Sequence, residues 1–175
     1  MTSQELNDRC DAAVCALSAG DNDALSTIYD LMARQIYVTA YAITANHADA
    51  EDALQDTILQ IVKYAPSYRA GTSARAWMLT LARHRAVDIV RRRKSIIHIE
   101  DEQLASIADP NDSTEIASVW ELLNALKEQE RQLVILRLYD ELSYAEIARV
   151  MGISVAAAEK RYQRALKKLK NAYLP

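Results

Sequence analysis

The segment LSYAEIARVMGISVAAAEKRYQRALKKLK, from Leu142 to Lys170, carries the most specific pattern in this chain. Ser143 and Glu146 have the spacing of a capping box, which begins a short helix, and Gly152 supplies the left-handed residue that ends it. Ser154 can cap a second helix that is apolar on one face and mostly basic on the other. The expected buried positions of the second helix are Val155, Ala158, Tyr162, Leu166, Leu169 and Tyr173. Its expected outward positions are Ala156, Glu159, Lys160, Gln163, Arg164, Lys167 and Lys170.

Two helices joined by a tight glycine turn, the second of them basic on its outer face, predict a helix-turn-helix whose second helix fits a major groove. The alternative is an ordinary helical hairpin with a solvated basic face. We favour DNA binding, because a capping box, a glycine turn and a second cap occur together at the required spacing.

The composition favours an all-α protein. The chain has 175 residues, half of them hydrophobic, with only three Gly and three Pro. No apolar run reaches membrane-spanning length and no signal peptide opens the chain, so we expect a cytoplasmic protein without membrane insertion. Cys10 and Cys15 are too few for a disulfide framework, and no metal or other cofactor is expected.

The charge is unevenly distributed along the chain. The net charge is −3, which is unfavourable for a protein that contacts phosphates. Acidic residues concentrate in 5–30, 49–56 and 100–115, whereas basic residues concentrate in 83–94 and 160–170. This segregation indicates two partners, one basic and one anionic. The alternative is that acidic and basic helices pair with each other inside one fold.

The N-terminal half is predicted to hold four helices. Residues 1–20 form an extension, for which Ala12, Ala13, Ala16 and Leu17 can provide the docking face and no function is predicted. A second helix, capped by Asp21 or Asn22, is followed by a third that Asn46 can cap. The third buries Ala50, Leu54, Ile58, Ile61 and Val62, and it exposes Glu51, Asp52, Gln55, Asp56 and Gln60.

A loop and a long basic helix complete this half. Pro66 and Gly71 interrupt the helical pattern in YAPSYRAGTS, residues 64–73. Ser73 can cap the helix ARAWMLTLARHRAVDIVRRRK, whose polar side carries Trp77, Thr80, His84, Asp88 and Arg91. Its terminal run RRRK suits either the negative end of the helix dipole or contact with phosphates.

An acidic segment without clean periodicity, residues 95–114, is predicted to link two helical domains. The division is therefore 1–20, 21–94, 95–114 and 115–175. In the last part, one helix capped by Ser113 or Thr114 buries Ile116, Val119, Trp120, Leu123 and Leu126, and a second buries Leu133, Val134, Ile135 and Leu138. No phosphate loop, HExxH motif or nucleophile elbow occurs, so an enzyme is not expected.

The order of these segments resembles the extracytoplasmic-function (ECF) group of bacterial sigma factors. The matching pattern is AEDALQDTILQIV, a loop, AWMLTLARHRAVDIVRRRK, an acidic linker, and LKEQERQLVILRLYDELSYAEIARVMGISVAAAEKRYQRALKKL. The resemblance covers about residues 21–171. It implies a two-domain initiation factor whose first domain binds core RNA polymerase and melts the −10 promoter element, while the second reads the −35 element. An anti-sigma factor is a further implied partner.

The resemblance also implies site residues. The polymerase-binding surface, which docks on a coiled coil of the largest polymerase subunit, falls on Asp52, Gln55 and Asp56. The −10 contacts fall on Tyr68, Arg69, Trp77, His84, Asp88, Arg91 and Arg92, with a flipped base held by the loop 68–74; the family often has Asn where His84 stands. The −35 contacts fall on Ser154, Ala156, Glu159, Lys160, Gln163, Arg164 and Lys167. At two of these positions, 156 and 159, the family commonly has Gly and a cation.

The linker is implied to pass toward the polymerase active-site cleft, with Asp101, Glu102 and Asp109 in the path of the RNA. Two other hypotheses remain open from the sequence. One is a plain helix-turn-helix regulator, and the other is an interaction protein that keeps the sigma fold without initiating transcription.

Overall fold

The computed structural model describes residues 1–97 and 114–173, and within these ranges every regular element is a helix. The elements are α1 (Ser3–Ser18), α2 (Ala24–Thr44), α3 (His47–Tyr64), the short 3-10 helix η1 (Ala65–Ser67), α4 (Ala74–Ile97), α5 (Thr114–Asn124), α6 (Glu128–Leu138), α7 (Tyr144–Met151) and α8 (Val155–Tyr173). The predicted all-α class with a terminal helix-turn-helix is confirmed. The linker residues Asp101, Glu102 and Asp109, and the predicted cap Ser113, lie outside the described residues.

Most of the predicted caps form. The Ser143 hydroxyl accepts from the Glu146 amide at 3.2 Å, while the Glu146 carboxylate accepts from the Ser143 amide at 2.8 Å. Gly152 ends α7 at φ 65°, a left-handed conformation that favours glycine. Asn46 caps α3 by accepting from the Asp49 amide at 2.9 Å.

The start of α2 differs from the prediction. Its N-cap is Asp23, which makes no side-chain cap bond, rather than Asp21 or Asn22. Asp21 is used one step earlier, because its carboxylate accepts from the Asp23 amide at 3.0 Å and shapes the turn that leads into the helix. The prediction was wrong because three polar residues in a row all have cap chemistry, and only the turn from α1 selects among them.

Several residues expected to be buried are exposed. In α3 the buried face is Ala50, Ala53, Thr57 and Ile61, and Val62 is exposed. Ala53 and Thr57 thus lie inward. A search for large apolar residues at helical spacing does not find them, because one is small and the other carries a hydroxyl group. Four further residues are also exposed: Val119, Leu138, Val155 and Tyr173. Of these, all but Val155 line an apolar groove of about 670 Å³ that α2, α5, α6 and α8 surround.

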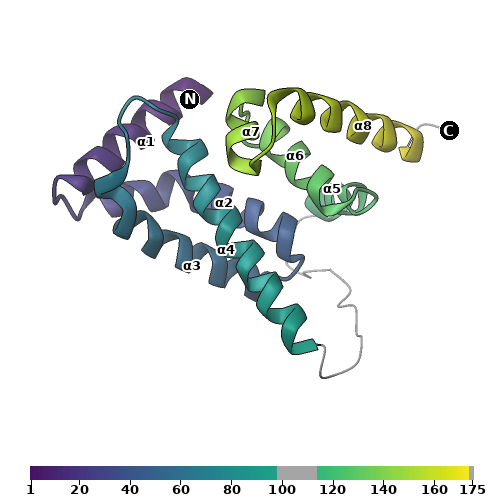
Figure 1. Ribbon diagram of the computed structural model, residues 1–175, viewed down its shortest axis with the longest axis horizontal. Helices are drawn as coiled ribbons and strands as arrows, with labels where there is room; N and C mark the ends of the chain where they lie inside the picture. The colour runs from purple at the N-terminus through teal and green to yellow at the C-terminus, as the bar shows by residue number, and fades with distance from the viewer. Residues whose placement is uncertain (98–113, 174–175) are drawn as a thin grey trace.

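The helices form two groups (Figure 1). In the first, α2, α3 and α4 pack against one another, and α1 packs on α2 and α4. In the second, α8 packs on α6 and α7. The groups contact each other through α2 with α6 and through α4 with α7, so one hydrophobic cluster runs through both.

Polar side chains line the contact between the two groups. The Arg131 guanidinium donates to the Ala42 carbonyl at 2.9 Å, and the Arg83 guanidinium donates to the Gln132 side-chain oxygen at 3.0 Å. Beside these bonds, the ring of Trp120 meets the ring of Tyr41 edge-on, with centroids 4.6 Å apart. Specific hydrogen bonds therefore set how the two groups fit together.

Asp140 is the most deeply buried acid of this contact, with no exposed surface. Its main-chain carbonyl accepts from Arg75, and its carboxylate accepts weakly from Thr39 at 3.4 Å. The other carboxylate oxygen has no hydrogen-bond partner among the described residues. Burial raises the pKa of Asp140 to about 8, although the charge of Arg75 and the bond from Thr39 act in the opposite direction.

Candidate nucleic-acid interface

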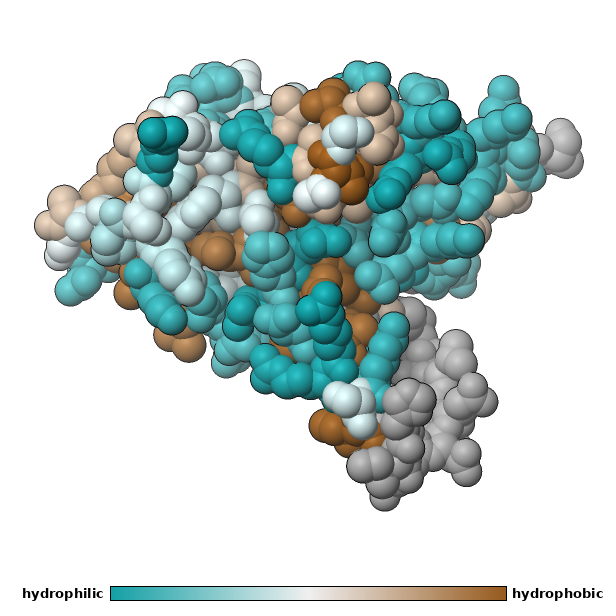
Figure 2. Space-filling view, in the orientation of Figure 1, coloured by the Kyte–Doolittle hydropathy of each residue, from teal (hydrophilic) through white to brown (hydrophobic). Residues whose placement is uncertain are grey.

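The helix α8 presents its polar face to solvent. Ser154 caps this helix, since its hydroxyl accepts from the Ala157 amide at 3.1 Å. The inward face is fixed by buried Ala158, Tyr162 and Ala165. All seven residues expected to contact the −35 element are exposed: Ser154, Ala156, Glu159, Lys160, Gln163, Arg164 and Lys167. Figure 2 shows hydrophilic side chains over the part of the surface that α8 occupies in Figure 1.

Other basic residues of α8 hold this helix on α6. The Arg161 guanidinium donates to Gln129 at 3.0 Å, and the Lys168 ammonium contacts both carboxylate oxygens of Glu130 at 2.6 and 2.8 Å. These two cations therefore lie beside the outward face and orient it.

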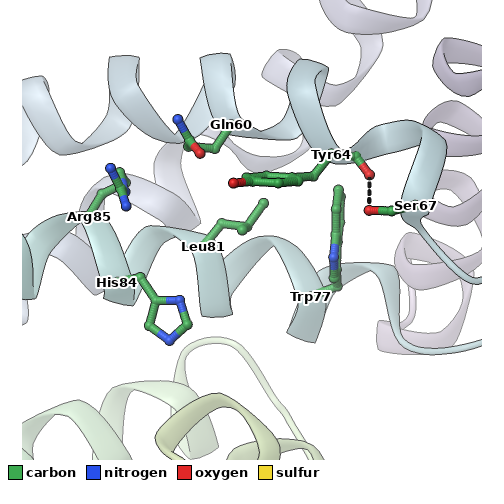
Figure 3. Close-up of a pocket in the computed structure, with 7 residues that line it drawn as sticks. All are labelled: Gln60, Tyr64, Ser67, Trp77, Leu81, His84 and Arg85. Atoms are coloured by element: carbon green, nitrogen blue, oxygen red, sulfur yellow. Dashed lines mark hydrogen bonds between the residues drawn. The ribbon is translucent and has the colours of Figure 1, made fainter.

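A second candidate surface lies between α3, η1 and α4. A hollow of about 330 Å³ is lined by Gln60, Tyr64, Ser67, Trp77, Leu81, His84 and Arg85. Figure 3 shows Tyr64 reaching it from α3 and Trp77 from α4, with His84 further along α4. The hollow thus combines two aromatic side chains with imidazole, guanidinium and amide groups, which can stack on a base and hydrogen-bond to its edge.

The structure brings only part of the expected −10 set to this hollow, and the loop 68–74, which was expected to hold a flipped base, does not line it. Trp77 and His84 line it, whereas Arg91 and Arg92 are exposed further along α4. Arg91 follows Trp77 by fourteen positions, which is about 21 Å along the helix axis at the usual rise. Asp88 forms an ion pair with Arg85 at 3.0 Å and so partly neutralises a cation of the hollow.

The side chain of Arg93 bonds to other parts of the fold. It pairs with the Asp49 carboxylate and donates to the Thr44 carbonyl at 3.1 Å, so it ties the end of α4 to the start of α3. The run RRRK was open to two interpretations, and the structure separates its members. Arg93 is structural, while Arg91, Arg92 and Lys94 are exposed.

Tyr68 is held rather than free. Its ring lies against that of Trp77, with centroids 5.0 Å apart. Its hydroxyl contacts the Asp11 carboxylate at 2.6 Å and the Thr72 carbonyl at 3.1 Å. Burial and the bond to Asp11 raise the pKa of Tyr68 to about 12, so the hydroxyl stays a hydrogen-bond donor. Arg69, next to it, is exposed.

The polar surface of α3 contains a residue that the sequence analysis missed. Asp52 and Gln55 are exposed and Asp56 is partly so, as expected. Leu59 lies one turn beyond Gln55 and is 65% exposed. The sequence indicates Leu59 by its place, because it is a large apolar residue outside the predicted buried stripe. Its exposure adds an apolar contact point to an otherwise polar surface.

Within residues 1–97 and 114–173, no group of three or more His, Cys, Asp or Glu side chains is placed to hold a metal ion. Over the same residues, no helix has the length and apolar character needed to cross a bilayer.

Comparison with known proteins identifies the family. The chain matches the family model for sigma-70 region 2 over residues 28–96 and that for sigma-70 region 4 over residues 116–169. The ECF RNA polymerase sigma factor SigK of Mycobacterium sp. (strain KMS) is 30% identical over 162 residues, which cover 86% of this chain and 83% of SigK. SigK of Mycobacterium ulcerans (strain Agy99) is 29% identical over 175 residues, with 94% of each chain covered.

Two solved structures share the fold. The sigma factor RpoE from Bartonella quintana, in complex with the anti-sigma factor NepR, has a TM-score of 0.72 at 23% identity, covering 83% of this chain and 94% of that one. CnrH in complex with the cytosolic domain of CnrY also has a TM-score of 0.72, at 21% identity, covering 94% and 96%. The helix-turn-helix, the region 2 and region 4 matches and the SigK relatives agree, and the chain belongs to the ECF sigma factors, the alternative sigma factors that direct promoter-specific transcription initiation.

Proposed function

We propose that this sigma factor uses three separate surfaces: α3 for core RNA polymerase, the hollow with α4 for the −10 element, and α8 for the −35 element. The proposed division is an N-terminal extension over 1–20, a polymerase and −10 domain over 21–94, a linker over 95–114 and a −35 domain over 115–175. The chain itself performs no chemistry in this proposal, and it acts in the cytoplasm with the polymerase.

The observation that carries the proposal is the aromatic hollow between α3 and α4. A base that is read outside the duplex must leave the stack and enter a pocket with a stacking surface and hydrogen-bonding groups. Tyr64 and Trp77 supply the first, and Gln60 and His84 supply the second. The exposed cations Arg91 and Arg92 continue along α4, where they can contact phosphates.

Run-off transcription with purified core polymerase and a library of −10 sequences tests this use of the hollow. We expect Trp77→Ala to lower transcription and flatten the preference at one −10 position, since stacking of one base contributes about 1–3 kcal/mol. Lys94→Ala, an exposed change elsewhere on α4, serves as the control for a general loss of activity. An unchanged −10 ranking in Trp77→Ala would exclude the hollow as the base-binding site.

For the polymerase, we propose that Asp52, Gln55 and Asp56 form the polar part of the contact and Leu59 its apolar part. The motif position of the first three and the exposure of the fourth support this surface. Gln55→Ala with Asp56→Lys, and separately Leu59→Ser, should weaken binding to core polymerase in a competition assay while the helical CD signal is kept.

The matched control for the polymerase surface is Asp30→Lys on α2, which reverses one exposed charge on a different helix. If both α3 variants compete as well as the control, the polymerase contact lies on another surface. If core polymerase does not bind the unmodified chain, the proposed polymerase surface on α3 is wrong.

For the −35 element, we propose that Lys160, Gln163 and Arg164 carry most of the base reading and that Lys167 contacts the backbone. The side chain of Glu159 is exposed, so it can face a base, where a carboxylate accepts from cytosine N4. Glu159→Arg should therefore change which −35 sequences are transcribed, whereas Lys167→Ala should lower activity on all of them alike. An identical −35 ranking in Glu159→Arg would mean that this residue does not face the bases.

We also propose that an anti-sigma factor binds this chain, since the related sigma factor RpoE forms a complex with the anti-sigma factor NepR. The apolar groove lined by Val119, Leu138 and Tyr173 offers a place for the apolar face of a partner helix.

Because the net charge is negative, the free chain is expected to bind duplex promoter DNA poorly, until polymerase aligns its two DNA-reading surfaces.

A further inference from the structure

A polar stripe on α1 faces the loop beside the proposed base-binding hollow. Ser3, Asn7 and Asp11 are spaced four residues apart, so they lie on one side of the helix. Each of them contacts the loop or the first turn of α4. A different side of α1 packs on the core through Cys10, Val14 and Leu17, which are buried.

Asp11 makes the contacts that fix the loop. One carboxylate oxygen accepts from the Tyr68 hydroxyl at 2.6 Å and from the Gly71 amide at 3.0 Å. It therefore joins two points three residues apart across the turn, where Gly71 has φ 77°. Within the loop, the Thr72 hydroxyl donates to the Arg69 carbonyl at 2.7 Å, and the Asp11 bonds hold that turn against α1.

Asn7 and Ser3 secure the junction between the loop and α4. The Asn7 side-chain oxygen accepts from the Ser73 hydroxyl and the Arg75 amide, both at 3.3 Å. The Ser3 hydroxyl accepts from the Arg75 guanidinium at 2.6 Å. The start of α4 is thus fixed relative to α1 as well as to the loop, and Trp77 lies in the next turn.

We propose that Asp11 is a positioning residue for promoter reading, because it holds Tyr68 and Gly71 in the geometry that places Trp77 at the wall of the base-binding hollow. The link is the contact between the Tyr68 and Trp77 rings. When Asp11 is removed, the Tyr68 hydroxyl keeps only the Thr72 carbonyl, and the Gly71 amide loses its acceptor. This inference rests on the proposed role of the hollow in reading the −10 element.

The test compares Asp11→Ala and Asp11→Asn in run-off transcription with core polymerase on separate −10 and −35 sequence panels. Asparagine keeps the oxygen that accepts both bonds, whereas alanine removes it. We expect Asp11→Ala to change the relative use of −10 variants about five- to tenfold, and Asp11→Asn to stay within about twofold of the unmodified chain. The −35 ranking should not change in either variant.

Asp8→Ala is the matched control, because Asp8 is an exposed acid on the same helix and contacts only Gln4, at 2.7 Å, among the described residues. Tyr68→Phe keeps the ring and removes the hydroxyl, so it should shift the −10 ranking in the same direction as Asp11→Ala. It also tests the inference if Asp11→Ala does not fold.

The outcomes separate this inference from the proposal beneath it. If Trp77→Ala changes the −10 ranking but neither Asp11→Ala nor Tyr68→Phe does, Asp11 is only an anchor and the positioning role is overturned. A uniform loss of transcription on all promoters, with a lower melting temperature, overturns it equally. If Trp77→Ala itself leaves the ranking unchanged, the failure belongs to the proposed base-binding hollow.

Discussion

Replacing Asp140 with asparagine should remove a pH dependence from the stability of this protein. Asp140 is fully buried between the two groups of helices, and burial raises its pKa to about 8 from an ordinary value of 3.8. Between those two pH values the folded state holds a proton on this carboxyl that the unfolded state has released. Stability is therefore greatest at low pH within this window and falls as the pH rises toward 8.

The size of the effect follows from the linkage relation. One proton of difference between the two states changes the free energy of unfolding by about 1.4 kcal/mol per pH unit. From pH 5 to pH 8 this single carboxyl can lower the free energy of unfolding by up to about 4 kcal/mol, and by about 2 kcal/mol if water enters the contact. In Asp140→Asn the amide does not titrate, so this loss is absent. Any constant penalty from the unpaired amide group affects all pH values equally.

Urea unfolding followed by far-UV circular dichroism at pH 5, 6, 7 and 8 measures the difference. We expect the unmodified chain to lose stability relative to Asp140→Asn at each step, with the gap widening toward pH 8. Glu141→Gln is the control, because it removes the exposed neighbouring charge and should leave the slope as it is. Parallel pH profiles for the unmodified chain and Asp140→Asn would refute the argument from burial.

Three further outcomes test local features. Gly152→Ala should lower the free energy of unfolding by about 1 kcal/mol in denaturant titration, because alanine is strained at φ 65° although its methyl group meets no neighbour. Arg93→Ala should lower the thermal midpoint by a few degrees in a calorimetric scan, since it breaks the pair with Asp49 and a bond to the end of α2. Ellman's reagent at pH 8 should modify Cys15 before Cys10, because burial raises the pKa of Cys10 to about 11 and shields its sulfur. Mass mapping that finds Cys10 labelled first in the folded chain would contradict this.

The sequence predicted the helix caps and the helix-ending glycine, because the residues that interact there are close along the chain. The capping box of Ser143 and Glu146, the left-handed Gly152 and the cap at Asn46 all involve residues three or four positions apart. Contacts between helices could not be predicted in this way, because their partners are far apart along the chain. Arg92 and Arg93 stand next to each other in one basic run, but only Arg93 is brought to Asp49 by the approach of α3.

The candidate site shows the same division. The residues on one face of α8 follow from helical periodicity, and their exposure agrees with it. The spacing of Ser3, Asn7 and Asp11 was also visible, but its meaning depends on a loop about sixty residues away. The burial of Asp140 was invisible, because an acid at the end of a helix is normally solvated and only packing between the two groups removes its water.

The chemistry of the contact between the two groups of helices determines how they fit together. Arg83, Arg131 and Thr39 each contribute one polar group there, and water can replace every one of these hydrogen bonds when the groups move apart. Each hydrogen bond is weak on its own, so these bonds set the geometry of the contact, while the shared hydrophobic cluster supplies the buried apolar area that holds the groups together. Apolar replacements at Arg83 or Arg131 would therefore remove directional bonds and leave non-directional apolar burial to set the angle between the two groups.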